Sequence, residues 1–228
     1  MYSLPVLLKN LKFELDETDA IYIVDESPNE IFLEIQKSCI AAMQGSKGLL
    51  FISNNEFKSG RGASIRRGII KSIQLFPNLE HIIECDADGS HQTFDIISLK
   101  RSKKSADLLI GSRYLNESKI IGWPISRSIL SRILNFSIPR IIGVQVSDIT
   151  NGLRRYSRSA FEAIVATTPE TNGFIYLTEI ALLIKKKGLI IDEVPTTFVN
   201  RTIGESTVTL KELSSAAIGL FLIMKKVV

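Results

Sequence analysis

The amino-acid sequence predicts an α/β domain built on a mostly parallel, doubly wound sheet. Short aliphatic and β-branched runs alternate with amphipathic helical segments along the first half of the chain. Acidic residues follow two of these runs directly, and ligands of parallel sheets bind at the carboxyl ends of strands. The 228 residues, 45% of them hydrophobic, are enough for one large domain with a substantial core.

The first quarter of the chain shows the alternation clearly. Leucines recur with helical spacing over residues 4–15, and a β-branched and aromatic run follows at 20–24. Turn residues at 25–29 end that strand and start a helix that reaches about residue 43. The next strand is expected at 48–53. Strand–helix steps of this length favour crossovers between parallel strands, so these segments predict the start of a doubly wound sheet.

The pattern continues through the middle of the chain. Gly60 and Gly62 lead into a helix that ends near residue 76, and residues 81–85 form a third strand. A helix at 92–103 and a strand at 107–111 follow. The later predictions are helices at 123–142, 159–166, 176–187 and from 210 onward, and an edge strand at 189–199 that contains a proline.

Composition and charge narrow the function classes. The net charge is +4 and the basic residues are scattered, which suits phosphorylated ligands or an anionic membrane surface. The sequence has no zinc-finger or RNP-like motif and only 7% aromatic residues, so no nucleic-acid partner is expected. Cys39 and Cys85 lie in apolar contexts and are interpreted as core residues of a protein in a reducing compartment.

The two ends of the chain carry no clear targeting segment. The first residues lack the basic start and the small-residue cleavage site of a signal peptide. Near the other end, the apolar run 216–224 is far shorter than the roughly 20 residues that span a bilayer, and Lys225 and Lys226 follow it. This run is either a core-packed terminal helix or an interfacial membrane helix.

Two carboxylates stand directly after the third strand. Asp86 and Asp88 are spaced i, i+2 in an extended segment, so their side chains point to the same side. Such a pair can hold one Mg²⁺ or Mn²⁺ and leave coordination positions open for a diphosphate. Asp-Ala-Asp-Gly is also ordinary turn chemistry, so the tripeptide alone does not separate a metal site from a turn.

Further motifs stand in a fixed order around this pair. They are Asp25-Glu26, Gly60-x-Gly62-Ala63, Gly111-Ser112-Arg113-Tyr114, Trp123-x-x-x-Arg127, Asp148 with Gly152, Glu193-Val194-Pro195 and Arg201-x-x-Gly204-Glu205-Ser206. In this combination, the chain resembles the family-2 glycosyltransferases of the GT-A fold, and most of all the dolichyl- or polyprenyl-phosphate mannose and glucose synthases. The resemblance implies a glycosyltransferase domain at 1–208 and a C-terminal helix at 209–228.

The resemblance implies a binding site for a nucleotide-sugar donor. The residues that match the family's nucleotide contacts are Asp25, Glu26, Gly60, Gly62 and Asp86. The expected ligands of Mg²⁺ or Mn²⁺ are Asp86, Asp88 and Ser90, with Asp88 as the direct ligand. Ser90 departs from the family, because relatives often carry a Gln at this position. A bound cation would neutralise the departing diphosphate.

The resemblance also implies a lipid monophosphate as the acceptor. A phosphate is already an anion at neutral pH, so the acceptor needs positioning by arginine rather than a strong general base. Arg113 and Arg127 match the family's phosphate-holding arginines, and Arg201 matches a third one near the diphosphate. With Asp88, these are the expected catalytic residues. Asp148 and Glu193 either orient the acceptor or the sugar, or serve as a helix cap or ion-paired strand residue.

One departure from the family concerns the sheet itself. Relatives have an additional strand before the helix at 4–15, and it lies between the strand ending at Asp25 and the strand ending near Asp86. This sequence begins at that helix. We therefore expect two unpaired strand edges inside the core, or a sheet that closes differently.

The expected function is metal-dependent, inverting transfer of a hexose from a nucleoside-diphosphate sugar to polyprenyl or dolichyl phosphate. The expected location is the cytoplasmic face of a membrane, to which the chain binds peripherally. One alternative is a catalytically inactive relative that acts as a binding or scaffold protein, since one strand is missing and Ser90 and Asn29 replace the family's usual Gln and Asp. A weaker alternative is a nucleotidyltransferase, which would release diphosphate instead of a nucleoside diphosphate.

Overall fold

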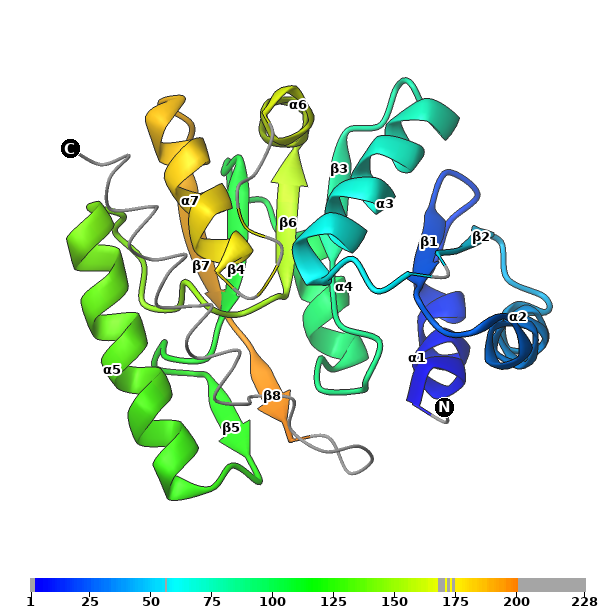
Figure 1. Cartoon of the computed structure of the whole chain (residues 1–228), viewed down its shortest axis with the longest axis horizontal. Coiled ribbons are helices and arrows are strands. Elements are labelled where there is room, and N and C mark those ends of the chain that lie inside the picture. The colour runs from blue at the N-terminus through cyan, green and yellow to red at the C-terminus, as the bar shows by residue number, and fades with distance from the viewer. Residues whose placement is uncertain (1–2, 56, 168–170, 172, 174, 201–228) are drawn as a thin grey trace.

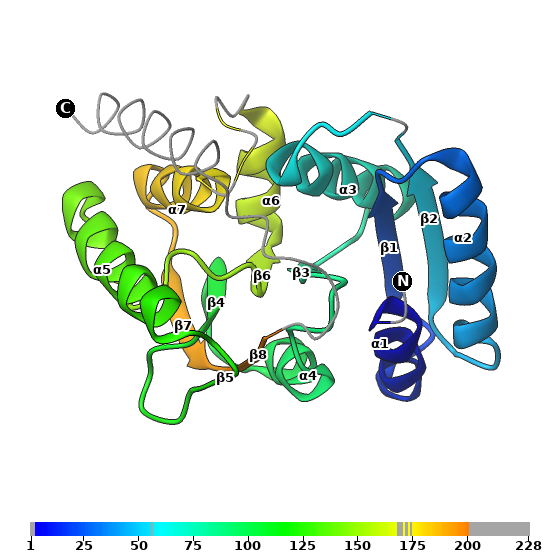
Figure 2. The ribbon, with the colours of Figure 1, turned by 60° about the horizontal axis from the view of Figure 1, so that its bottom comes forward.

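The computed structural model describes residues 3–55, 57–167, 171, 173 and 175–200 (Figure 1). The predicted C-terminal helix at 209–228 and the predicted catalytic residue Arg201 lie outside these residues. The described chain forms an α/β fold in which helices pack on both sides of the strands, as the sequence predicts. Figure 2 shows α3, α6 and α7 on one side of the strands and α4 on the other.

The first part of the chain forms two strands and the helices that cover them. Its elements are α1 (Ser3–Leu11), the short 3-10 helix η1 (Lys12–Glu14), β1 (Ala20–Asp25), α2 (Asn29–Met43) and β2 (Leu49–Asn54). Strands β1 and β2 pair in parallel, with Ala20 opposite Leu49 and Asp25 opposite Asn54. Leu8 of α1 packs on Cys39, Ala42 and Met43 of α2, which confirms Cys39 as a core residue.

The rest of the chain forms the larger part of the fold. Its helices are α3 (Arg61–Leu75), α4 (Thr93–Arg101), α5 (Ile125–Ile142), α6 (Arg158–Ala166) and α7 (Tyr176–Lys186). Its strands are β3 (His81–Glu84), β4 (Leu108–Ser112), β5 (Lys119–Ile121), β6 (Arg154–Ser157), β7 (Ile191–Pro195) and β8 (Thr197–Val199). Most of these elements lie within two or three residues of their predicted bounds.

The main sheet has the order β3-β6-β4-β7. Strand β7 pairs in parallel with β4 and lies at the edge, as its proline predicts. Strand β6 is antiparallel to both β3 and β4 and is not among the predicted strands. Its sequence carries Arg154 and Arg155, whose charges argue against a buried strand, yet both side chains are buried. Strands β5 and β8 form a separate parallel pair.

The sheet is split between β1 and β3. Strands β1 and β2 form a two-stranded sheet of their own, and no strand among the described residues pairs with the second edge of β1 or of β3. This is the position at which the family resemblance predicts unpaired edges. The split also shows in burial: the aliphatic residues of β1 are only half-buried, whereas every residue of β4 is buried.

Side chains join the two halves where backbone pairing does not. Leu7 and Leu11 of α1 share an apolar cluster with Ile96 and Leu99 of α4, and Ile21 of β1 packs against this cluster. Lys100 at the end of α4 also contacts Asp19 just before β1, with 2.5 Å between Nζ and Oδ2. A larger apolar core lies on the other face of the main sheet, between its strands and helices α3, α5, α6 and α7.

Candidate active site

The Asp86–Asp88 pair lies in a tight turn after β3. Ser90 donates to Asp88 Oδ1 twice, from its backbone N–H at 3.0 Å and from Oγ at 2.6 Å. Gly89 takes a positive φ of +81°, which closes the turn. The structure therefore holds Ser90, a predicted metal ligand, against Asp88. The residues predicted to hold the metal themselves form this turn. The formation of a turn here therefore does not exclude metal binding.

Arg61 is the principal contact of Asp86. Its guanidinium extends from the start of α3 to β3, where Nη1 donates to Asp86 Oδ1 and Nη2 lies 2.9 Å from Glu84 Oε1. Burial raises the pKa of Asp86, but the charge and hydrogen bond of Arg61, with the nearby His91 and Arg113, together outweigh burial and hold the pKa below its usual value. A Cβ at Gly152 would collide with the Arg61 guanidinium. Gly152 thus leaves the space that this arginine occupies.

Asp25 and Glu26, predicted to contact the nucleotide, lie at the carboxyl end of β1. Asp25 accepts hydrogen bonds from the backbone N–H and the hydroxyl of Ser27. Glu26 accepts bonds from the hydroxyls of Ser59 and Ser64 at the start of α3. Burial raises the pKa of Glu26, but these bonds outweigh it, so the pKa lies below its ordinary value. Glu26 therefore ties β1 to α3.

The local structure requires glycine at both positions that are predicted to line the nucleotide pocket. Gly60 has a φ of +89° at the residue before α3, a conformation that other residues rarely adopt. Gly62 lies against the ring of Tyr176, where an added Cβ would approach Cδ2 to 2.6 Å. Their contact with a nucleotide stays a prediction.

Arg113, predicted to hold the acceptor phosphate, forms a buried ion pair. Its Nε and Nη2 lie 2.7 and 2.8 Å from the two carboxylate oxygens of Asp148, and Nη2 also donates to Thr150 Oγ1 at 2.7 Å. Burial raises the pKa of Asp148, but the Arg113 charge and the hydrogen bonds from Arg113 and Thr150 together outweigh burial, so the pKa lies below its usual value. Glu193 accepts bonds from the backbone N–H groups of Ser147 and Asp148. Asp148 and Glu193 thus fix the orientation of Arg113.

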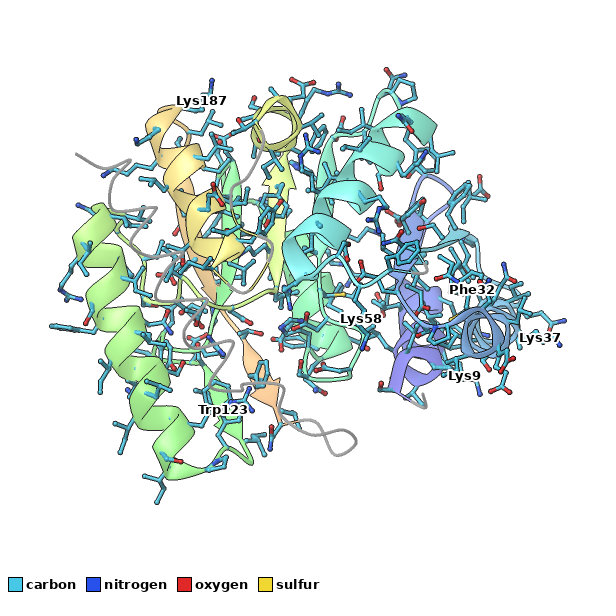
Figure 3. The ribbon with its side chains drawn as sticks, viewed as in Figure 1. Lys9, Phe32, Lys37, Lys58, Trp123 and Lys187 are labelled. Atoms are coloured by element: carbon cyan, nitrogen blue, oxygen red, sulfur yellow. The ribbon has the colours of Figure 1, made fainter. Side chains whose placement is uncertain are left out.

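The structure brings Arg113 and Arg127 together around one indole ring. The two guanidinium carbons lie 5.0 and 4.2 Å from the ring centroid of Trp123, within cation–π range. Phe198 of β8 packs on the same indole, with ring centroids 5.3 Å apart. Figure 3 shows Trp123 beside β5 and β8. Arg127 also donates to Asn200 Oδ1 at 3.1 Å.

His91 connects the carboxylate turn to this arginine cluster. Its Nδ1 accepts from the backbone N–H of Asp86 at 3.0 Å, so the ring proton is on Nε2, which donates to Asn151 Oδ1 at 3.1 Å. Its ring also contacts Phe198 edge-on, with centroids 5.7 Å apart. His91 therefore links the Asp86–Asp88 turn to the aromatic side chains around which Arg113 and Arg127 gather.

The residues of the turn fit a divalent cation that shares its coordination with a diphosphate. Asp86 and Asp88 supply carboxylate oxygens, the ligands that Mg²⁺ and Mn²⁺ prefer. Among the described residues, no group of three or more His, Cys, Asp or Glu could hold a metal. Two carboxylates would leave the remaining coordination positions of such a cation to water and to substrate oxygens.

Sequence reasoning missed Arg61 and Asn135 as site residues. Arg61 lies between the two glycines that the sequence singles out, and its charge opposite to Asp86 was the available signal. Asn135 of α5 accepts from the backbone N–H of Ile149 at 2.8 Å and donates to Thr150 Oγ1 at 3.0 Å. No local motif marks Asn135, because its partners become neighbours only when α5 packs on the loop before β6.

The fold and the site together define the class of this protein. A split Rossmann-like sheet carries paired carboxylates at a strand end and a cluster of arginines beside them. Solved structures of glucosyl-3-phosphoglycerate synthase from Mycobacterium tuberculosis, one in complex with phosphoglyceric acid and one with uridine diphosphate, superpose with TM-scores of 0.62 and 0.61. Each superposition covers 99% of this chain and 75% of the solved chain, and the sequence identities are 14% and 13%. The fold is that of the GT-A glycosyltransferases.

Sequence comparison shows the family. The chain is 30% identical over 205 residues to undecaprenyl-phosphate mannosyltransferase from Micrococcus luteus, covering 90% of this chain and 81% of the relative. It is 26% identical over 215 residues to polyprenol monophosphomannose synthase from Mycolicibacterium smegmatis, covering 94% and 79%. No family model matches the sequence. The chain belongs to the polyprenyl-phosphate mannosyltransferases of glycosyltransferase family 2, and it is a glycosyltransferase.

Proposed function

We propose that this protein transfers a hexose, mannose in the first place, from a nucleoside-diphosphate sugar to a polyprenyl phosphate. The relatives in Micrococcus luteus and Mycolicibacterium smegmatis are named undecaprenyl-phosphate mannosyltransferase and polyprenol monophosphomannose synthase, which supports mannose as the sugar and a polyprenyl phosphate as the acceptor. The observation that carries the proposal is the arrangement of the site. The Asp86–Asp88 turn lies next to the cluster of Arg113, Arg127 and Trp123, with His91 between them.

The donor side would hold the nucleotide-sugar through its diphosphate. Asp86 and Asp88 would hold Mg²⁺ or Mn²⁺, which when bound supplies positive charge to the departing nucleoside diphosphate. Glycosyltransferases of this fold generally use such a cation. The Arg61 guanidinium provides a second positive charge at Asp86. Asp25 and Glu26 would contact the nucleoside from the carboxyl end of β1.

The acceptor side would position a phosphate that already carries the attacking oxygen. Arg113 is fixed by its bidentate pair with Asp148, and Arg127 by its contacts with Trp123 and Asn200. Two oriented guanidinium groups suit a phosphate monoester, because each offers planar N–H donors to its oxygens. A single in-line displacement by this oxygen would invert the anomeric carbon. Arg201, outside the described residues, would join at the diphosphate.

Peripheral binding at the cytoplasmic face of a membrane is part of the proposal, because a long polyprenyl chain stays in the bilayer. Among the described residues, no helix is both long enough and apolar enough to cross a membrane. In this proposal the residues of the acceptor side meet the lipid phosphate at the membrane surface.

The test is a transfer assay with the purified chain. Radiolabelled GDP-mannose and UDP-glucose are each incubated with undecaprenyl phosphate in detergent, with Mn²⁺ or with a chelator, and label is counted in the organic phase. We expect metal-dependent transfer from GDP-mannose and release of GDP. Release of inorganic diphosphate would identify a nucleotidyltransferase instead. Donor binding without any transfer would support the inactive-relative alternative.

A further inference from the structure

A cavity of about 350 Å³ lies at the edge of the main sheet where β3, β4 and β7 begin. His81, the first residue of β3, and Ser157, the last residue of β6, are paired across the sheet and form part of its wall. The candidate active site lies at the opposite ends of β3 and β4, so the cavity is separate from it. We call it the amino-edge cavity, and its lining consists of residues 102–107, His81, Arg155, Ser157 and Ile190.

Arg155 of β6 contributes a buried guanidinium to the wall of this cavity. The residue is only 3% exposed. Its Nη1 donates to the carbonyls of Leu99 and Ser102 at 2.9 and 2.7 Å, and its Nη2 donates to the carbonyl of Lys104 at 2.8 Å. These bonds hold the segment after α4 over β6. The Nε of Arg155, by contrast, has no hydrogen-bond partner in the described part of the chain.

The charge of Arg155 has no counter-ion in the protein. Carbonyl oxygens satisfy its N–H groups but carry no net charge, and no acidic side chain among the described residues forms an ion pair with it. Its partners across the ladder are Ile83 and Leu109, which are apolar. Burial lowers the pKa of Arg155. Because a buried charge without a counter-ion is costly, an anion at the cavity wall would stabilise this arrangement.

The other two buried arginines in the described part of the chain each have an acidic neighbour. Arg113 forms the bidentate pair with Asp148, and Arg154 lies opposite Glu84 in the register of β6 and β3. Cross-strand neighbours of opposite charge attract one another. Arg155 therefore differs from both in facing a cavity where an acidic partner would be expected.

Further groups of the wall donate hydrogen bonds or carry positive charge. Lys104 is engaged by Asp192 at 3.0 Å, whereas no ion pair involves the exposed Lys103 among the described residues. The exposed His81 and the hydroxyl-bearing Ser105 belong to the same wall. Guanidinium, ammonium and hydroxyl groups around one space are the donors that bind an anion with several oxygens.

The acidic and apolar members of the lining narrow the class of ligand. Asp107 already accepts bonds at both oxygens, from the Ser157 hydroxyl at 2.6 Å and from the Ile190 backbone N–H at 2.9 Å. Ala106 and Ile190 are the apolar members, so the wall offers little surface to a prenyl chain. Ligand pockets span roughly 300–1,000 Å³. A cavity at the lower end of this range has room for a phosphate and a small group attached to it.

We propose that the amino-edge cavity binds a small phosphorylated anion, whose charge complements Arg155 and Lys103. This inference goes beyond the proposed function and does not depend on it, because the proposed donor and acceptor bind at the other edge of the sheet. The binding requires neither a nucleotide-sugar nor a polyprenyl phosphate, so it can be tested on the chain alone.

The experiment is an NMR titration of the full chain with inorganic phosphate, at constant pH and ionic strength. The chain has two histidines, and each reports one edge of the sheet: His81 lines the cavity, and His91 lies beside the Asp86–Asp88 turn. We expect the imidazole signals of His81 to shift and to saturate. A shift at His91 alone would assign the phosphate to the active site and overturn the proposal. A His81 shift that never saturates, or that chloride reproduces, would also overturn it.

Lys103→Gln tests whether the charge at the wall binds the phosphate. We expect the affinity measured at His81 to fall about tenfold, because one charge-assisted contact is lost. The matched control is Lys37→Gln, which removes the same charge from an exposed lysine on α2 (Figure 3) and should keep the wild-type affinity. Equal losses in the two variants, or no loss in Lys103→Gln, would contradict the proposal.

Thermal unfolding gives a second readout that leaves Arg155 in place, since its replacement would also remove the donor of three carbonyls. Phosphate should raise the unfolding temperature of the wild type more than chloride does, because a ligand of the folded state stabilises it. The rise should be smaller in Lys103→Gln. A rise that is kept in Lys103→Gln and lost in Arg127→Ala would assign the stabilisation to the acceptor site and overturn the proposal.

Failure of this inference is distinguishable from failure of the proposed function. The titration uses neither donor nor acceptor, so a saturable His81 shift in a chain that transfers no sugar would contradict the proposed function alone. Sugar transfer by a chain whose His81 signals ignore phosphate would contradict the amino-edge site alone.

Discussion

The acceptor side and the donor side of this site are built in different ways. Arg113, Asp148 and Glu193 are interlocked on the continuous sheet β3-β6-β4-β7, and the Arg113–Asp148 pair is almost completely buried. On the donor side, Asp25 and Asp86 extend from strands that belong to separate sheets. Polar side chains such as Glu26 and Arg61 bridge them, and they remain partly exposed.

This difference separates stability from binding. Buried, fully paired charges are costly to disturb, because removing one partner leaves the other charged and desolvated. Partly exposed polar contacts exchange readily with water and with ligand groups. Substitutions on the acceptor side should therefore alter folding first, whereas substitutions on the donor side should alter ligand binding first.

The largest effect should come from Arg113→Met. Asp148 would lose its bidentate partner while fully buried, so the free energy of unfolding should fall by about 3–5 kcal/mol. Urea unfolding followed by circular dichroism measures this. The control is Arg101→Ala, which removes the exposed pair with Glu14 and should cost less than about 0.5 kcal/mol. Similar costs for the two variants would contradict the comparison.

Asp88→Ala should give the next largest effect, on binding. We expect metal-dependent affinity for the nucleotide-sugar to fall by at least about tenfold, because one carboxylate of a two-carboxylate site is lost. The free energy of unfolding should change by only about 1 kcal/mol. Asp88 is partly exposed, and its replacement removes only the acceptor of the two hydrogen bonds from Ser90. Calorimetric titration with and without Mn²⁺ measures the affinity, and an unchanged affinity would refute the metal assignment.

Arg127→Ala tests whether the acceptor side also contains a residue devoted to binding. Arg127 is only partly buried, and it contacts the indole of Trp123 and the amide of Asn200, both of which are uncharged. We expect the KM for a short-chain prenyl phosphate to rise about tenfold, because one charge-assisted contact with the phosphate is lost. Donor affinity should stay at the wild-type value. A normal KM would remove Arg127 from the acceptor site.

The smallest effect should appear at Glu26. In Ser64→Ala, Glu26 loses a hydrogen bond of 2.6 Å, so its pKa should rise toward its ordinary value. A depressed pKa contributes stability above the unfolded pKa of about 4.3, and this contribution is lost as pH falls through the lower folded pKa. The variant should therefore be less stable by about 1 kcal/mol near neutral pH and match the wild type in acid.

Carboxyl NMR titration and urea unfolding between neutral and acid pH check this prediction. The control is Ser128→Ala, whose hydroxyl bonds to the Pro124 carbonyl at 3.3 Å. A stability loss in Ser64→Ala that persists unchanged into acid would show that the serine acts through packing and not through Glu26.

The sequence predicts most of the fold because its helices and parallel strands follow simple apolar periods. Strand β6 escapes this reasoning, because its two arginines find their partners among backbone carbonyls of the preceding loop and of segments far apart in the sequence. Arg154 donates to the carbonyls of Asn151, Ile149 and Leu177. Arg155 donates to those of Leu99, Ser102 and Lys104, which belong to α4 and the segment after it. Only the assembled fold supplies these acceptors.

For the candidate site, too, local motifs could be predicted from the sequence and long-range contacts could not. Asp86, Asp88, Arg113 and Arg127 could be predicted, because local motifs mark them and the family resemblance orders them. That Asp148 pairs with Arg113, or that Arg61 reaches Asp86, depends on the approach of segments far apart in the sequence. Spacing along the chain does not encode such pairs. The contacts of Asp86, Asp88, Arg113, Arg127 and Arg201 with metal or substrate stay predictions.

The split in the sheet also bears on how the molecule opens. No ladder hydrogen bond among the described residues joins β1 to β3, so the β1–β2 unit can separate without breaking the main sheet. What resists separation is the apolar cluster of α1 and α4 with a few polar bridges. The molecule should therefore contain two foldons. Amide hydrogens of β1 and β2 should exchange through a partial opening, at a lower free energy than those of β4, which exchange only when the whole chain unfolds.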